Sequence, residues 1–449
     1  MKRVIITKGT GHTRLYTLFF RWLGSCLSGC MFLFLPFSAY AEWQFSGVAD
    51  STARSAWGYD YGEGGKGYTG LEEFANLRLK APVGEQGMVF AAVNLAAASG
   101  TALSLVPAGQ TGTVAEPYVS GKGYASALEL ERLYIRLEGE ETDLEAGLLR
   151  IPFGFGQAFR PTDFLNPPNP LFPDARPRGS LGAVYTMYPT GLCIVRLFYV
   201  GGEDPLKTTG AGVIGGVSGE IHGPKASAQG FYVFQAPGGS AGAGVGIDGG
   251  LVSSIPSSRP IHRFGLAIKL ESEASFVLDA LYNWYDRSWT GWQGLQAALG
   301  VDYSILKGKL IMVVQYLYNG QGTLNPGDRL SRLYEPDAGR WEDVSPEERT
   351  LRSDIPIGEL NRKNYLNGGA TYQFSDYTRA TFSCTAGLDD GSLVPLLSVE
   401  HEPLQGLLVS ASFQIFLDGK ALGYGSYGEL GPAHAGKWGE LTLKARVRF

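Results

Sequence analysis

The feature that most constrains the fold is an alternation of apolar and polar residues that recurs along nearly the whole chain. In the closing segment LTLKARVRF (441–449), every second residue from Leu441 to Phe449 is apolar. FANLRLKA (74–81), FVLDALYNW (276–284) and LLVSASFQIFLD (407–418) show the same pattern. A period of two places alternate side chains on opposite faces of a β-strand. The sequence therefore predicts an all-β chain whose strands each have one apolar face.

The connections between these segments alternate in length. We expect about eighteen strands (16–18), built on alternating segments of roughly 10–14 residues and joined by tight turns at one end and mostly by long loops at the other. A soluble β-sandwich has shorter strands of about five or six residues and no such alternation of loop length. The pattern favours a transmembrane antiparallel up-and-down β-barrel with both termini at the tight-turn end. The long connections are 99–124, 153–179, 236–259, 320–363 and 419–437.

Low charge and a lack of long apolar runs support the barrel. Only 18% of the residues are charged, against about 25% in a typical soluble domain. No segment after residue 41 has the roughly 18 consecutive apolar residues that a spanning helix needs. Lipid offers no hydrogen bonds, so the strand edges of a membrane sheet must pair with each other in a closed barrel. A barrel of about eighteen strands leaves a water-filled lumen.

Residues 1–41 have the pattern of an export signal. A basic start precedes an apolar run over 22–37, and Ala39-Tyr40-Ala41 matches a small-x-small cleavage site. Cleavage there would give a barrel of residues 42–449; a membrane anchor and lipidation at Cys30 remain alternatives. All five basic residues of this segment leave with it, so the formal net charge changes from −5 to −10. That charge argues against nucleic acid as a partner.

The sequence does not predict an enzyme, a metal site or a cofactor. Cys193 and Cys384 lie in separate predicted strands, and whether they pair as a disulfide stays open. No cysteine pair has metal-site spacing. No nucleophile motif accompanies the four histidines that follow the signal. A barrel enzyme that uses His262 and His434 is retained as a minor alternative.

One stretch carries a family resemblance. LLRIPFGFGQAFRPTDFLNPPNP (148–170) is similar to the R-x-P-x-G-x-G…P-T-D-x-x-N-P run of porin-like barrels related to phosphate-selective and alginate-export channels. With the export signal, the strands and the terminal Phe449, the chain resembles general and substrate-selective porins of diderm bacteria. The resemblance implies an outer-membrane location, a bilayer and small hydrophilic solutes as partners, and a homo-trimer as one oligomeric state. It also implies that the strand ending at Phe449 addresses the chain to the assembly machinery.

The third long connection, residues 153–179, is the candidate constriction. Its six prolines exclude helix and ladder strand, while Gly154 and Gly156 allow a sharp bend. The resemblance implies that this loop folds into the barrel, where opposed charges screen solutes by size and charge. An external loop that resists proteases is the alternative. The candidate constriction and pore-binding residues are Arg150, Arg160, Asp163, Asp174, Arg176 and Arg178.

Strand parity also predicts a basic lumen wall. Such a wall would favour anions by raising their local concentration. Asp279 and Asp418 fall on the same face and weaken the effect, and cross-strand ion pairs that stiffen the wall are the alternative role. The predicted wall residues are Arg78, Lys80, Arg132, Arg136, Lys444, Arg446 and Arg448.

These expectations combine into one function and two alternatives. The chain is expected to be a passive channel for small hydrophilic solutes with a mild preference for anions. A hydrophobic-substrate transporter of the fatty-acid type would need an N-terminal plug, and the strand pattern starts at Trp43, which leaves no room for one. A structural or adhesive barrel would act through its loops, above all the mixed-charge loop 320–363.

Overall fold

The structure is a computed structural model of the full chain. It describes residues 43–58, 67–100, 119–121, 124–165, 179–201, 213–236, 260–285, 291–320, 322, 360, 362–419, 428–432 and 437–449. The predicted export signal 1–41, Cys30 and most of the loop 320–363 lie outside these residues and stay predictions.

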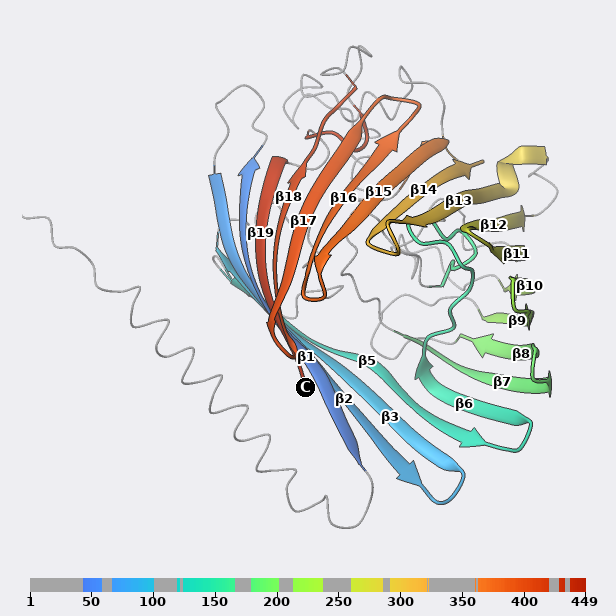
Figure 1. The fold of residues 1–449 in the computed structure, drawn as a ribbon. Helices are drawn as coiled ribbons and strands as arrows, with labels where there is room; N and C mark the ends of the chain where they lie inside the picture. Colours follow the sequence, from blue (N-terminus) through green and yellow to red (C-terminus); the bar gives the residue numbers. More distant parts are fainter. Residues whose placement is uncertain are drawn as a thin grey trace, which may run out of the picture.

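The described residues form one antiparallel sheet that closes on itself (Figure 1). Of nineteen strands, the three-residue β4 pairs only with β5, so eighteen strands make up the closed wall. The predicted barrel is therefore confirmed. The strands are β1 Gln44–Gly58, β2 Gly67–Val83, β3 Gly87–Gly100, β4 Val119–Gly121, β5 Tyr124–Glu138, β6 Thr142–Leu149, β7 Ser180–Thr190, β8 Cys193–Val200, β9 Ile214–His222, β10 Ala226–Gln235, β11 Ile261–Glu271, β12 Ala274–Tyr285, β13 Leu295–Ile305, β14 Leu310–Asn319, β15 Asn364–Ser375, β16 Thr378–Gly387, β17 Leu393–Leu404, β18 Leu407–Ile415 and β19 Lys437–Arg448.

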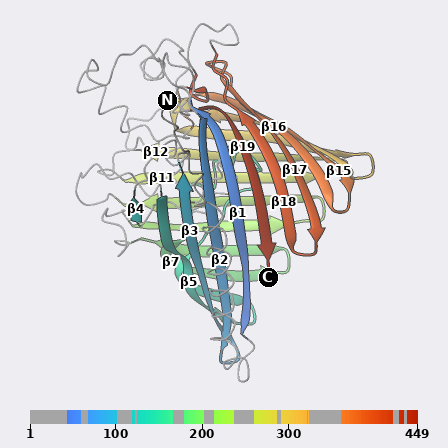
Figure 2. The same cartoon turned by 90° about the vertical axis from the view of Figure 1, so that its left-hand side faces the viewer.

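The first and last strands close the barrel. β19 pairs with β18 on one side and with β1 on the other. The terminal Phe449 exchanges two backbone hydrogen bonds with Gly47, at 2.8 and 3.2 Å. The C-terminus lies at the end of the barrel where tight turns join the strands (Figure 2). The ladder thus holds the apolar terminus in place.

The outward face is apolar and has aromatic residues near both ends of the strands. Leu443, Val447 and Leu397 are among the many large apolar side chains exposed there. Trp57 stacks on Trp438 at the long-loop end, with ring centroids 5.4 Å apart. A belt of this kind between two aromatic girdles is the surface that a lipid bilayer covers. In the part of the chain that the structure describes, no helix is long and apolar enough to cross a membrane.

The structure corrects one strand boundary and answers one question that the sequence left open. The predicted strand 143–152 ends at Leu149, because the chain turns into the lumen at Arg150 instead of continuing the ladder. Cys193 on β8 and Cys384 on β16 are free thiols. Their strands are not neighbours in the sheet, so the disulfide that the sequence left open does not form.

The inward face is mostly polar and hydrogen-bonded across strands. Asn76 on β2 donates to Asn94 on β3 at 2.7 Å and to Glu131 on β5 at 2.5 Å. Glu131 sits at a β-bulge, where the register between β3 and β5 shifts. The bulge lets both Glu131 and Arg132 face inward, because one extra residue is inserted into the ladder. A cluster of hydrogen-bonded polar side chains on β2, β3 and β5 therefore lines this part of the wall.

Candidate functional site

The candidate site is a stretch of chain inside the barrel, residues 150–165, which we call the lumen segment. Directly after β6 it leaves the wall and runs through the interior toward β12 and β13 (Figure 1). It is the described part of the predicted constriction loop, since 166–178 lie outside the described residues. Phe153, Phe159 and Thr162 are all at most 2% exposed. The segment therefore packs against the inner wall and reduces the open cross-section of the lumen.

Three inward side chains of the wall hold its backbone. Gln229 on β10 accepts a hydrogen bond from the Gly154 amide at 2.7 Å. Asp279 on β12 accepts from the amides of Phe155 and Gly156, the first at 3.2 and 3.3 Å to its two oxygens. Hydrogen bonds that involve a charged group contribute about 1.5–3 kcal/mol each. Asp279 therefore holds the first bend of the segment to the wall.

The tethering continues along the segment to β14. Gln315 accepts from the amides of Ala158 and Phe159 at 2.8 and 3.0 Å and donates back to the Phe159 carbonyl at 2.5 Å. The Thr162 hydroxyl donates a hydrogen bond to Asp279 at 2.9 Å. These bonds fix the segment at both ends of its turn. Backbone polar groups that would otherwise be buried without partners are satisfied by the wall.

The turn within the segment depends on close backbone approach. Gly154 has φ +79, and a Cβ placed on it would overlap Thr162 and Asp279. Only glycine adopts this backbone region without steric cost. The Arg160 guanidinium donates to the Gly156 carbonyl at 2.9 and 2.7 Å, which closes the turn from the other side. The Gly-x-Gly pattern thus shapes the bend that the sequence indicated.

Aromatic packing adds a second anchor. Phe153 packs against Phe231, Phe198 and Phe164, with ring centroids 4.6, 5.5 and 5.7 Å apart. Farther along, Phe159 contacts Tyr365 at 6.4 Å. Two strands carry a sequence signal for these contacts, because they are apolar on both faces. They are CIVRLFYV (193–200) of β8 and the FYVF stretch within β10. A strand that is apolar on both faces indicates packing inside the barrel as well as outside.

The predicted constriction charges divide into two groups. Arg150 at the start of the segment lies 3.3 Å from a Glu131 oxygen. Arg160 and Asp163 form a pair at 3.6 Å within the segment, and Asp163 is buried. Asp174, Arg176 and Arg178 lie outside the described residues, so their role stays a prediction. The described charges are of both signs and lie in the lumen, where a constriction would need them.

The predicted wall residues face inward, and three of the seven are paired with carboxylates. Arg446 forms a two-pronged pair with Asp50, with both contacts at 2.7 Å. Arg136 pairs with Asp143 at 2.6 Å, and Arg132 lies 3.4 Å from Glu131. Arg78 instead donates to the Asn76 amide oxygen at 2.6 Å. Of the remaining predicted wall residues, Lys80 and Arg448 are exposed near the tight-turn end, whereas Lys444 lies midway along the strand, opposite Thr52.

A buried polar network at the long-loop end was not predicted. Arg362 is fully buried, and its guanidinium lies 3.0 Å from Asp390. Asp390 accepts from the amide of Glu429 at 2.9 Å, and Glu429 in turn accepts from the hydroxyl of Tyr365. The network joins segments that are far apart in sequence, so no local pattern could have indicated it. It braces the interior of the barrel beside Phe159.

A metal-binding group would be another kind of functional site. Among the described residues, no group of three or more His, Cys, Asp or Glu side chains is placed to hold a metal ion. The lumen segment places charges of both signs inside the barrel. Charges inside a narrow, partly desolvated passage act strongly on solutes that cross it.

Comparison with known proteins supports the fold. No protein-family model matches the chain. No curated protein matches it in sequence. Among solved structures, OccAB1 of Acinetobacter baumannii has a TM-score of 0.50 at 8% identity, over 92% of this chain and 98% of that one. OccAB4 of Acinetobacter baumannii scores 0.49 at 9% identity (91% and 98% covered), and the outer membrane protein opdK from Pseudomonas aeruginosa scores 0.46 at 8% (90% and 98% covered).

At these identities the likeness concerns the fold alone, and only the first of the three scores reaches 0.5. The similarity of residues 148–170 to phosphate-selective and alginate-export channels stays a prediction. The closed eighteen-stranded antiparallel sheet and the likeness to OccAB1 together show that the chain has a porin-like β-barrel fold.

Proposed function

We propose that this chain is an outer-membrane channel, not an enzyme, through which small hydrophilic solutes diffuse passively. The observation that carries the proposal is the lumen segment, whose backbone is bonded to Gln229, Asp279 and Gln315 of the inner wall. A loop fixed inside a polar lumen sets an upper limit on solute size without closing the pore. The apolar outer belt supports a bilayer as its surroundings.

The test is a planar-bilayer recording of the refolded barrel. We expect discrete conductance steps, and we expect uncharged polymers above a threshold size to leave the conductance unchanged because they cannot enter. Complete absence of steps from pure, folded protein would overturn the proposal. The matched variant Asp279→Ala should raise the size threshold, because it removes the hydrogen bonds that Asp279 accepts from the amides of Phe155 and Gly156 at the first bend.

Two alternatives remain as outcomes of this experiment. A transporter of the fatty-acid type would show no steps and would bind detergent or fatty acid in the lumen. A structural or adhesive barrel would lose its activity when residues within 320–363 are deleted, while its conductance stayed unchanged.

We propose only a slight preference for anions. Most of the lumen arginines lie beside carboxylates, as Arg446 lies beside Asp50 and Arg136 beside Asp143. Paired charges produce a weak net field beyond their own neighbourhood. The preference would come from basic side chains near the turn-end mouth, such as Lys80 and Arg448, which are exposed. A reversal potential in a salt gradient measures it directly.

We further propose that copies of this chain associate through the outer face of β1–β3. Ser51 on β1 donates to Glu73 on β2 at 2.8 Å, and both point outward. Ser51 lies six residues from Phe45 and six from Trp57, so this polar pair sits midway between the two aromatic girdles. A charged group in the middle of the lipid belt costs up to a few kcal/mol. Contact between this face and a second copy of the chain would keep Glu73 away from lipid and so would remove that cost.

The oligomer and the assembly signal have separate tests. Replacing Glu73 by Leu should convert a cross-linked oligomer to monomers if this face is the contact. If the face meets lipid instead, the same change should stabilise the barrel and leave the oligomeric state unchanged. Replacing Phe449 by Ala should slow insertion in vesicles that contain the assembly machinery, since the terminal Phe is the proposed signal.

A further inference from the structure

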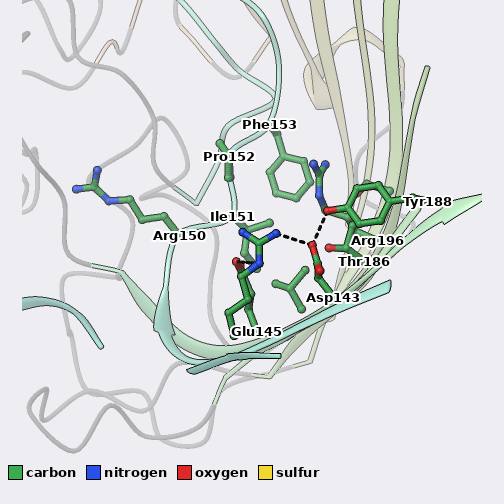
Figure 3. Close-up of a pocket in the computed structure, with 12 residues that line it drawn as sticks. Asp143, Glu145, Arg150, Ile151, Pro152, Phe153, Thr186, Tyr188 and Arg196 are labelled. Atoms are coloured by element: carbon green, nitrogen blue, oxygen red, sulfur yellow. Dashed lines mark hydrogen bonds and ion pairs between the residues drawn. The ribbon is translucent and has the colours of Figure 1, made fainter. Parts of the chain in front are cut away.

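The strongest unassigned feature is a cavity in the inner wall on the tight-turn side of the lumen segment. It has a volume of about 230 Å³ and lies between β5–β9 and residues 150–153 (Figure 3). That volume is below the roughly 300–1,000 Å³ of pockets that hold drug-sized ligands. A ligand the size of a single sugar ring suits it. The cavity lies inside the proposed channel, where a passing solute would reach it.

The cavity carries many charges, but they compensate one another. It is lined by three arginines and two carboxylates. Arg136 pairs with Asp143, Arg196 with Glu220 and Arg150 with Glu131, which leaves Glu145 as a further acidic group. Figure 3 shows Asp143 between Tyr188 and the guanidinium that it binds, while Arg150 points away from them. An anion entering this cavity would gain no net attraction, and it would compete with carboxylates already in place.

Paired charges still have hydrogen bonds to offer. Each guanidinium has five N–H donors and each carboxylate about four acceptor sites, and one pair uses only part of them. Ser218 on β9 adds a hydroxyl that is 1% exposed and has no hydrogen-bond partner within the described structure. Buried polar groups normally have partners, so an unpaired hydroxyl at a cavity points to a ligand or water. A cavity whose hydrogen-bond donors and acceptors lie close together can bind a ligand that carries several neighbouring hydroxyl groups.

One side of the cavity is apolar. Ile151 and Phe153 of the lumen segment and Val184 on β7 line it, and each is at most 4% exposed. A sugar ring has the same division, with C–H groups on its face and hydroxyls around its edge. Aromatic and aliphatic side chains pack against such a face, while charged and hydroxyl groups fix its orientation.

From this combination we propose that the cavity binds an uncharged polyhydroxylated solute of monosaccharide size. The inference rests on the proposed channel function and names the class of solute that this site would take. Inorganic ions would pass without being held. The site would give the channel a preference by hydrogen bonding rather than by charge.

The test compares three sugars of equal ring size in planar bilayers. D-glucose is uncharged, D-glucuronate is an anion and D-glucosamine is a cation. We expect glucose to reduce the ion current at a lower concentration than either charged analogue. Equal or stronger block by glucuronate would overturn the inference but leave the channel intact, because conductance steps would still be present.

Ser218→Ala provides the residue-level test. Removing one hydrogen bond to an uncharged ligand should weaken glucose block by about threefold to tenfold, with unchanged conductance in the absence of sugar. Ser410→Ala is the matched control, because Ser410 faces inward on β18 at a position outside this cavity. An equal effect of both changes would contradict the assignment. Thr186→Val, a change of the same shape at the cavity, should weaken block in the same direction.

Calorimetry separates the two proposals. Glucose titrated into the folded barrel in detergent should release or absorb heat that Ser218→Ala reduces. If no conductance is observed but this binding is present, the channel proposal fails and the binding site stands. If neither is observed, both are wrong.

Discussion

The inner wall has two regions that use similar polar side chains in different ways. One region is formed by β1, β2 and β19, and we call it the near wall. Its inward charges pair with each other, as Asp50 does with Arg446. The other region is formed by β10, β12 and β14, and we call it the far wall. Its inward polar groups bind the lumen segment, as Asp279 and Gln315 do. The strand periodicity is the same in both regions, so alternation alone does not decide the role.

The cross-strand neighbours explain the difference. Asp50 lies directly opposite Arg446 in the ladder, so a partner of opposite charge is at hand. Asp279 lies opposite Ala267 on β11 and Ala298 on β13, which offer neither charge nor bulk. The alanines leave room beside the carboxylate, and the backbone of residues 154–156 fills that room. A polar residue with small neighbours is thus available to hold a loop.

The largest expected effect comes from removing the far-wall tether. Replacing Gln229, Asp279 and Gln315 together by Ala should release the lumen segment and raise the single-channel conductance by about twofold or more, because a wider passage carries more ions. Recordings from single channels measure this. The control replaces Ser398, Ser410 and Ser412 by Ala, which changes inward polar residues of β17 and β18. Unchanged conductance in the tether variant would show that the segment is held by other contacts.

A smaller increase is expected from Gly154→Ala. The left-handed backbone at this position costs a non-glycine residue about 1–2 kcal/mol, and the new methyl group would also press on Thr162 and Asp279. The bend should shift while the Gln315 contacts remain. Gly368→Ala is the control, since a Cβ there meets nothing within 4 Å. Equal conductance of the two variants would argue against a tight bend.

The near wall should respond in stability rather than in conductance. Asp50→Asn removes one partner of a buried ion pair, a change that typically costs about 3–5 kcal/mol. We expect a lower midpoint in urea unfolding from vesicles and an unchanged single-channel conductance. A large change in conductance would mean that the Asp50–Arg446 pair also positions the lumen segment, and the comparison of the two walls would fail.

The smallest effect concerns ion selectivity. Arg448→Gln removes an exposed positive charge near the turn-end mouth, where salt screens charges over about 8–10 Å. The reversal potential in a salt gradient should move slightly toward cation preference. A large shift would show that the mouth, and not the lumen segment, is the main filter.

The strands and turns could be predicted from sequence because each depends on its own residues. The alternation in 74–81, 276–284 and 407–418 placed the inward and outward faces correctly. Tight turns such as 272–273 were found because they interrupt that alternation. The inward course of the third loop was also expected, although it rested on the family resemblance.

The partners of the site residues could not be predicted. Asp279 was recognised as a lumen acid, but its bonds to Phe155 and Gly156 join residues more than 120 positions apart. Gln229 and Gln315 look in sequence like ordinary inward residues. The basic wall was expected from parity, yet parity cannot show that Arg446 lies opposite Asp50, since that depends on the register of barrel closure.

The most direct test of the central claim is hydrogen exchange of the amides in residues 154–159. The amides of Gly154, Gly156 and Phe159 donate to wall side chains, so the account predicts slow exchange, comparable to strand amides, although the segment lies in a water-filled lumen. The same amides should exchange rapidly in the Gln229, Asp279 and Gln315 triple Ala variant. Rapid exchange in the unmodified protein would contradict a lumen segment fixed to the wall.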